Sequence, residues 1–176
     1  GIPMKDIRRI KEELKQHIRE SSSDKVYREL KEMELDIYSN AQNIFVQKAK
    51  ESKIEDVDFN NLPFGQVFTD HMFVCEFENG KWGQPKIIPY GKISLDPSAK
   101  IFHYGQSIFE GMKAYKDEQG RTWLFRPVDN QKRLNISAKR LAMPELPQEI
   151  FMDGLEALLK IDSAWIPTTK DSSLYV

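Results

Sequence analysis

The sequence predicts an α+β domain, an antiparallel sheet with helices packed on it, preceded by an N-terminal helical arm. Residues 5–53 contain neither Pro nor Gly and are rich in Lys, Glu and Arg, which is typical of solvated helices. From about residue 56, alternating apolar segments separated by Gly- and Pro-containing turns indicate strands and hairpins. Two later segments, beginning near residues 129 and 147, carry apolar residues at helical spacing.

The arm, residues 1–54, is expected to hold two amphipathic helices separated at the SSSD stretch. Its apolar positions recur at three- and four-residue steps, and then in a heptad-like spacing. The helices can pair as a hairpin or across a dimer, or they can pack as an arm on the chain's own domain. The positions are Ile7, Ile10, Leu14 and Ile18 in the first helix and Val26, Leu30, Met33, Ile37 and Ile44 in the second.

Residues 55–176 are expected to form the α+β domain, beginning with a hairpin. Residues 66–78 are rich in β-branched and aromatic side chains and predict a strand. A turn follows at Asn79-Gly80, and residues 85–90 predict the returning strand. The prolines of that strand place it near an edge of the sheet or limit its length.

A second hairpin is expected over residues 111–127, with its turn at the EQG stretch. Asp129 is expected to cap a helix that ends near Met143, and Pro147 to begin another. The final SSLYV stretch predicts one more strand. The apolar positions of the two helices are Leu134, Ala138 and Leu141 in the first and Phe151, Leu155, Leu158 and Leu159 in the second.

Composition restricts the classes of partner. The chain has 176 residues, 40% hydrophobic and 30% charged, which suits a soluble globular protein. Its 26 basic and 27 acidic residues give a net charge of −1, so no nucleic acid and no membrane surface is expected as a partner. No run reaches the roughly 18 apolar residues of a membrane span. Cys75 is the only cysteine, which excludes an intrachain disulfide and favours a reducing, cytoplasmic location.

The residues alone indicate little chemistry. The histidines, His17, His71 and His103, lack ligand spacing, so no metal site is expected. Tyr104, Phe109 and Tyr175 can line a small-molecule pocket or can be ordinary core aromatics. Arg133, one turn into a helix, can bind a phosphate or can belong to a solvated basic face.

Four ordered segments carry a family resemblance. FGQVFTDHMFVCEF, HYGQSIFEGMKAY, LFRPVDNQKRLNISAKRL and SSLYV together resemble the N-terminal small domain of branched-chain amino-acid aminotransferases, which are class IV enzymes that depend on pyridoxal 5'-phosphate. The resemblance covers about residues 56–176. D-amino-acid aminotransferases and aminodeoxychorismate lyases share these elements more loosely and are the alternative relatives.

The resemblance implies a transaminase that exchanges the amino group of Leu, Ile or Val with 2-oxoglutarate, using pyridoxal 5'-phosphate in a homodimer. Branched-chain amino acids and 2-oxo acids would be its ligands. The tyrosine at position 104 would reach into the neighbouring subunit's site. The implied roles are cofactor phosphate for Arg133, pocket wall for Phe64, Tyr104 and Phe109, pocket rim for Lys113, and the substrate carboxylate region for Tyr175.

In the family, the Schiff-base lysine lies in a larger domain downstream of the SLYV strand. The resemblance therefore places that lysine beyond Val176, and no catalytic residue is expected within these 176 residues, which should be inactive alone. The arm, residues 1–54, matches nothing in the family. A competing interpretation is a non-catalytic helical assembly module fused to a small-domain fragment.

Overall fold

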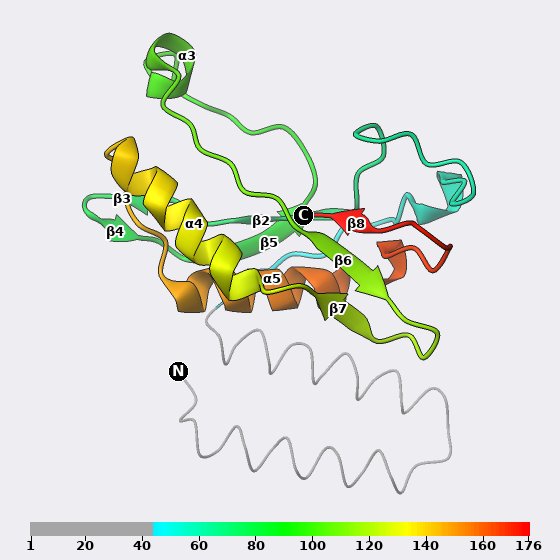
Figure 1. The fold of residues 1–176 in the computed structure, drawn as a ribbon. Helices are drawn as coiled ribbons and strands as arrows, with labels where there is room; N and C mark the ends of the chain where they lie inside the picture. The colour runs from blue at the N-terminus through cyan, green and yellow to red at the C-terminus, as the bar shows by residue number, and fades with distance from the viewer. Residues whose placement is uncertain (1–43) are drawn as a thin grey trace, which may run out of the picture.

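A computed structural model describes residues 44–176, and Figure 1 shows their arrangement. The elements, in chain order, are β1 (Phe45–Val46), the 3₁₀ helix η1 (Ile54–Asp56), β2 (His71–Val74), β3 (Phe77–Glu78), β4 (Lys81–Trp82), β5 (Lys86–Pro89), α3 (Lys100–Tyr104), β6 (Lys113–Lys116), β7 (Thr122–Leu124), α4 (Pro127–Arg140), α5 (Gln148–Ile161), the 3₁₀ helix η2 (Ser163–Trp165) and β8 (Leu174–Tyr175). The predicted mixture of helices and strands is confirmed for this part of the chain.

The strands of the described residues form three small sheets where the sequence predicted one antiparallel sheet. Their orders are β1-β5-β2, β3-β4 and β7-β6-β8. Strand β1 runs parallel to β5, whereas the other pairs are antiparallel. Most of the predicted arm lies outside the described residues. Its last part, residues 44–53, is not helical, because β1 pairs with β5 and Ile44 is buried.

The first predicted hairpin is confirmed in outline. The expected turn joins β3 to β4, with the positive φ angles of 51° at Asn79 and 76° at Gly80 that such a turn requires. Strand β5 returns along β2, with Phe73 opposite Ile87.

Strand β5 has four residues, in line with the expectation that its prolines limit its length. The prediction that β5 lies at an edge of its sheet is wrong, because β1 pairs with its other side. Strand β1 pairs only with Lys86 and Ile87, so Pro89 needs no N–H on that side.

The second hairpin and the last strand are also confirmed. Strands β6 and β7 pair with Tyr115 opposite Trp123, and β8 pairs along the other edge of β6. The Asp117 carboxylate fixes the turn between β6 and β7. It accepts hydrogen bonds from the backbone N–H of Arg121 at 2.8 Å and from Trp123 Nε1 at 2.8 Å.

The predicted cap of α4 is wrong. The helix begins at Pro127 with Arg126 in the capping position, so Asp129 already lies in the first turn. The Asp129 carboxylate accepts a hydrogen bond from Arg126 Nε at 2.6 Å and caps no backbone N–H. A proline suits the first helical position, because its fixed φ matches the helix and its missing N–H would have no partner within the helix, which explains this earlier start.

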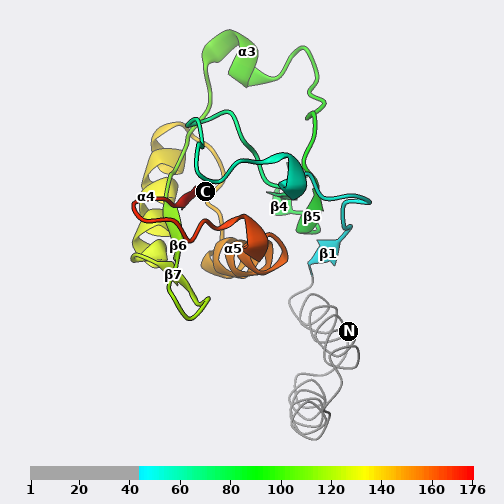
Figure 2. The same cartoon turned by 90° about the vertical axis from the view of Figure 1, so that its right-hand side faces the viewer.

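Helix α5 lies between the two larger sheets, as the end-on view in Figure 2 shows. Leu155 and Leu159 pack with Ala114 of β6, and Ala157 packs with Ile87 of β5. The predicted burial of Leu155 and Leu159 is therefore confirmed, with Phe151 and Leu158 packed against the same two clusters. The helix approaches β2 closely at Gly154, where a Cβ would lie 2.6 Å from the ring of Phe73.

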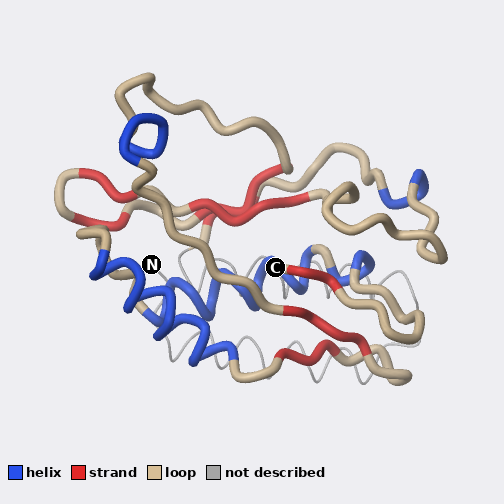
Figure 3. Tube along the Cα trace, turned by 45° about the horizontal axis from the view of Figure 1, so that its top comes forward, coloured by secondary structure: helices blue, strands red, loops and turns tan. Residues whose placement is uncertain are grey.

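The connection from β5 to β6 is almost entirely loop, with α3 as its single helix (Figure 3). This short helix projects away from the sheets and ends at Gly105, which has a left-handed φ of 59°. Phe102 and Tyr104 on it are 60% and 81% exposed. The Gln106 side chain anchors the loop by donating to the Leu141 carbonyl at 2.7 Å. The sequence analysis predicted no helix here.

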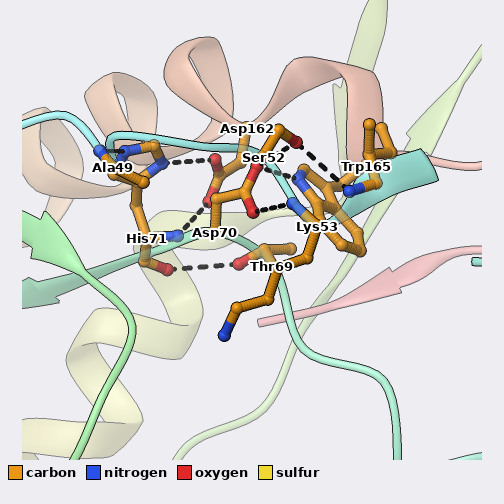
Figure 4. A network of polar contacts seen from close by, with 9 residues as sticks. Ala49, Ser52, Lys53, Thr69, Asp70, His71, Asp162 and Trp165 are labelled. Atoms are coloured by element: carbon orange, nitrogen blue, oxygen red, sulfur yellow. Dashed lines mark hydrogen bonds and ion pairs between the residues drawn. The ribbon is translucent and has the colours of Figure 1, made fainter. Parts of the chain in front are cut away.

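A buried polar pair joins β2 to the end of α5 (Figure 4). His71 and Asp162 are only 9% and 2% exposed. Nδ1 of His71 lies 2.7 Å from Asp162 Oδ1, and the His71 backbone N–H donates to Oδ2 at 3.0 Å. The Ala49 N–H donates to His71 Nε2 at 2.8 Å. Because Nε2 accepts this bond, the proton sits on Nδ1 and points at the carboxylate.

A second carboxylate extends the network toward the surface. Asp70 accepts hydrogen bonds from the Lys53 backbone N–H at 2.9 Å, the Ser52 hydroxyl at 2.6 Å and Trp165 Nε1 at 3.0 Å. Burial alone would raise the pKa of Asp70, but these donors together outweigh it and lower the pKa. His71, which Asp162 holds, and Asp70 thus fix residues 49–53 beside β2 and η2.

Replacing Asp162 by Asn should destabilise the chain by about 1–3 kcal/mol, because the amide turns N–H groups toward one of the two His71 donors. Urea unfolding followed by fluorescence measures the loss. Asp56→Asn on the exposed helix η1 is the matched control and should change stability by less than about 0.5 kcal/mol. Equal stability of the Asp162 variant and the wild type would contradict the role given to this carboxylate.

Candidate functional site

A cavity of about 560 Å³ opens between the start of α4 and the sheet β7-β6-β8. Strand β6 and the two residues between β7 and α4 supply one wall, α4 supplies the second, and β8 closes the third. Three of the sequence-predicted site residues meet here: Lys113, Arg133 and Tyr175. The full lining is Gly111, Met112, Lys113, Tyr115, Phe125, Arg126, Asp129, Asn130, Arg133 and Tyr175.

Arg133 is held in this cavity by a carboxylate. Its Nη2 donates to Glu110 Oε2 at 2.8 Å, while its Nε donates to Oε1. The two bonds form the parallel, bidentate arrangement that suits a guanidinium and a carboxylate. The Glu110 side chain is only 8% exposed, whereas the Arg133 side chain is 68% exposed, so the carboxylate is the fixed partner.

Further donors surround Glu110. Asn130 Nδ2 donates to Oε2 at 2.8 Å, and the Gly111 backbone N–H donates to the same oxygen at 3.1 Å. The hydrogen bond from Arg133 is the largest influence on the Glu110 carboxyl and, with these donors, lowers its pKa from 4.5 to about 2 against the opposing effect of burial. Glu110 is therefore an anion at neutral pH.

A second, aromatic cavity of about 390 Å³ shares part of its wall with the first. Lys113 and Tyr175 line both cavities, and Phe64 lines the second. The rings of Phe64 and Tyr175 meet edge to face with centroids 6.0 Å apart. The structure therefore brings four sequence-predicted residues, Phe64, Lys113, Arg133 and Tyr175, into two adjoining cavities.

Tyr104 and Phe109 lie elsewhere. They line neither of these two cavities and are 81% and 87% exposed. Tyr104 ends α3, the helix that projects from the sheets in Figure 1. Phe109 directly precedes Glu110 in the loop that leads into β6.

Two residues of the first cavity's polar network, Glu110 and Asn130, were not expected from the sequence. Asn130 precedes Arg133 by one helical turn, so helical periodicity could have placed the two on one face of α4. Glu110 lies 23 residues before Arg133, and no local spacing relates them.

Among residues 44–176, no group of three or more His, Cys, Asp or Glu side chains is arranged to hold a metal ion. Within the same residues, no helix is long and apolar enough to cross a bilayer.

The α+β fold carries two adjoining cavities, one lined by Arg126, Arg133 and Lys113 and the other mainly by aromatic side chains, and sequence comparison shows what the chain resembles. No family model matches the chain. The chain is 48% identical over 123 residues to branched-chain-amino-acid transaminase 1 of Bacillus subtilis, covering 69% of this chain and 35% of that protein. It is 49% identical over 120 residues to branched-chain-amino-acid aminotransferase 2 of the same organism, covering 68% and 33%.

A third relative comes from another genus. The branched-chain-amino-acid aminotransferase of Mycolicibacterium smegmatis is 47% identical over 118 residues, covering 66% of this chain and 32% of that protein. The predicted resemblance is confirmed: about two-thirds of this chain is branched-chain-aminotransferase-like. The chain spans about a third of the length of these curated relatives.

The ion pair at Glu110 predicts a pH dependence of stability. Because the folded pKa is lowered, the ionised carboxylate stabilises the fold above pH 4.5, and this contribution disappears as the pH falls to about 2. The difference in free energy of unfolding between wild type and Glu110→Gln should decrease by about 1 kcal/mol over this interval. The decrease is no larger than this because solvent screens the exposed guanidinium. Urea unfolding at pH 6 and pH 2 measures it, and a difference independent of pH would contradict the prediction.

Gly111→Ala tests the close approach between Gly111, which leads into β6, and the Tyr175 ring on β8. A Cβ at Gly111 would lie 2.6 Å from Tyr175 Cζ, so the ring must move away from β6. We expect a loss of about 1–3 kcal/mol and displaced NMR signals for the Tyr175 ring. Gly91→Ala is the control, because its Cβ would lie 4.0 Å from the Pro89 carbonyl oxygen. An unchanged Tyr175 signal in the Gly111 variant would show that the approach is not close in solution.

Proposed function

We propose that this chain is part of a pyridoxal-phosphate-dependent transaminase that exchanges the amino group of Leu, Ile or Val with 2-oxoglutarate. The observation that carries the proposal is its identity of 43–49% to branched-chain aminotransferases of several genera. In this proposal Arg133 holds the cofactor phosphate, and the aromatic cavity at Phe64 and Tyr175 forms part of the substrate pocket.

The residues of the first cavity fit a phosphate. Arg126, Arg133 and Lys113 place three cationic side chains around it. The Glu110 contacts engage Nε and Nη2 of Arg133, and the described residues offer no hydrogen bond to Nη1. Guanidinium groups bind phosphate oxygens well through such paired N–H groups. When bound, pyridoxal phosphate supplies the electron sink for the carbanion chemistry.

The second cavity suits an aliphatic side chain. Phe64, Phe59 and Leu62 line it together with Tyr175, so a branched hydrocarbon group loses water on entry at a gain of about 0.8 kcal/mol per buried methylene. Lys113 at the border of both cavities would stand at the pocket rim. A wall of this kind separates neighbouring substrates that differ by one methylene by only about 1–3 kcal/mol.

Two further parts of the proposal concern groups outside these cavities. Tyr104, which is 81% exposed, would reach into the site of the partner in a homodimer, and Phe109 would form part of the pocket wall. The lysine that binds the cofactor aldehyde would come from the two-thirds of the relatives that the chain does not span. The chain alone would therefore be inactive, and we expect it to act in the cytoplasm.

A transaminase assay on the 176-residue chain and on a form extended to the length of its relatives tests the proposal. The extended form should transfer the amino group of Leu, Ile and Val to 2-oxoglutarate, and D-Ala should be a poor donor. The chain alone should be inactive and should bind pyridoxal phosphate at millimolar concentration, because a few charge-assisted bonds barely offset the cost of immobilising a ligand.

Arg133→Ala in the extended form should lower its affinity for pyridoxal phosphate about 10- to 100-fold, the loss expected for a charge-assisted bidentate contact. Lys139→Ala is the control, because this exposed lysine pairs with Glu145 outside both cavities. Activity on D-Ala alone would assign the chain to a different substrate class. A cofactor affinity unchanged by Arg133→Ala would remove the phosphate role.

A further inference from the structure

The contact between Glu110 and Arg133 constrains one side of a guanidinium. Nε and one N–H of Nη2 point at the carboxylate, with Nη2 to Oε2 at 2.8 Å. A guanidinium has five N–H groups, so the edge formed by Nη1 and the second N–H of Nη2 faces away from Glu110. That edge can hold a second oxyanion in the same bidentate manner.

The carboxylate is itself fixed from two elements. Asn130 on α4 donates from Nδ2 to Glu110 Oε2 at 2.8 Å and to the Gly111 carbonyl at 3.1 Å. The Gly111 N–H donates to Oε2 at 3.1 Å from the loop that enters β6. Glu110 is therefore bound to both walls of the cavity, while most of the Arg133 side chain stands in solvent.

We propose that Glu110 is a positioning residue that holds the Arg133 guanidinium so that its outer edge faces a phosphate group in the cavity between α4 and β6. The inference rests on the proposed function, which assigns the phosphate to Arg133. Glu110 would make no contact with the ligand and would act only through Arg133.

Charge alone leads to the opposite expectation, which makes the inference testable. An anionic carboxylate beside Arg133 repels a phosphate, so its removal should strengthen phosphate binding if neutralisation were its main effect. Positioning acts the other way, because an exposed arginine released from Glu110 must lose its rotational freedom when the ligand binds. Besides Arg133, Glu110 accepts hydrogen bonds from two uncharged donors, Asn130 Nδ2 and the Gly111 N–H. These donors are not needed for neutralisation, but they fix the geometry of the carboxylate.

The experiment titrates the 176-residue chain with inorganic phosphate, followed by the phosphorus NMR shift. Glu110→Gln removes the charge, and Glu110→Asp keeps the charge but shortens the side chain, so that it no longer reaches Arg133 with both oxygens. Positioning predicts about three- to tenfold weaker phosphate binding in both variants. Glu145→Gln, which removes an equal charge from an exposed pair with Lys139, should bind like the wild type.

A second readout reports the arginine directly. The Nε–Hε signal of Arg133, assigned by its loss in Arg133→Ala, should exchange slowly with water in the wild type and faster in both Glu110 variants. Retained binding in Glu110→Asp together with tighter binding in Glu110→Gln would show neutralisation only and would overturn the inference. Unchanged phosphate binding in Arg133→Ala would instead overturn the phosphate role on which the inference rests, and with it that part of the proposed function.

Discussion

Helix α5 sets the distance between the two three-stranded sheets of the described residues, because one of its faces packs on each sheet. Leu155 and Leu159 contact the sheet that carries the site, and Ala157 contacts the sheet that contains β5. The close approach of Gly154 to Phe73 leaves no room for a larger residue between helix and strand. Asp162, directly after the helix, then binds His71 and fixes the end of α5 on β2. Packing and a buried hydrogen-bonded pair thus locate the same helix at two points.

Local patterns predicted most of the elements in this framework. The Asn79-Gly80 turn, the hairpin around Gly120 and the apolar stripe at Leu155 and Leu159 each depend on neighbours within about seven residues. Local sequence controls such features through turn geometry and helical periodicity. The same reasoning failed where the partner is distant, since strand β1 exists only because β5 lies beside it.

The candidate site shows the same limit more strongly. The family resemblance selected Arg133 and Tyr175, yet it did not identify Glu110, the residue that fixes Arg133. In the sequence Glu110 looks like any carboxylate in a loop, and only the folded chain places it beside α4. The pairing of His71 with Asp162 was missed for the same reason, as 91 residues separate them. A single sequence encodes such contacts only through the complete fold.

The two cavities have one wall in common, formed by Lys113 and Tyr175. Neither side chain can move without reshaping both spaces, and the Tyr175 ring lies so close to Gly111 that a Cβ there would collide with it. Under the proposed function, a ligand that displaces the tyrosine from one cavity would therefore change the affinity of the other. Thermodynamic linkage makes this effect reciprocal, so the second ligand must alter the binding of the first by the same factor. A wall two side chains wide would in this way couple the two binding equilibria of the proposed function.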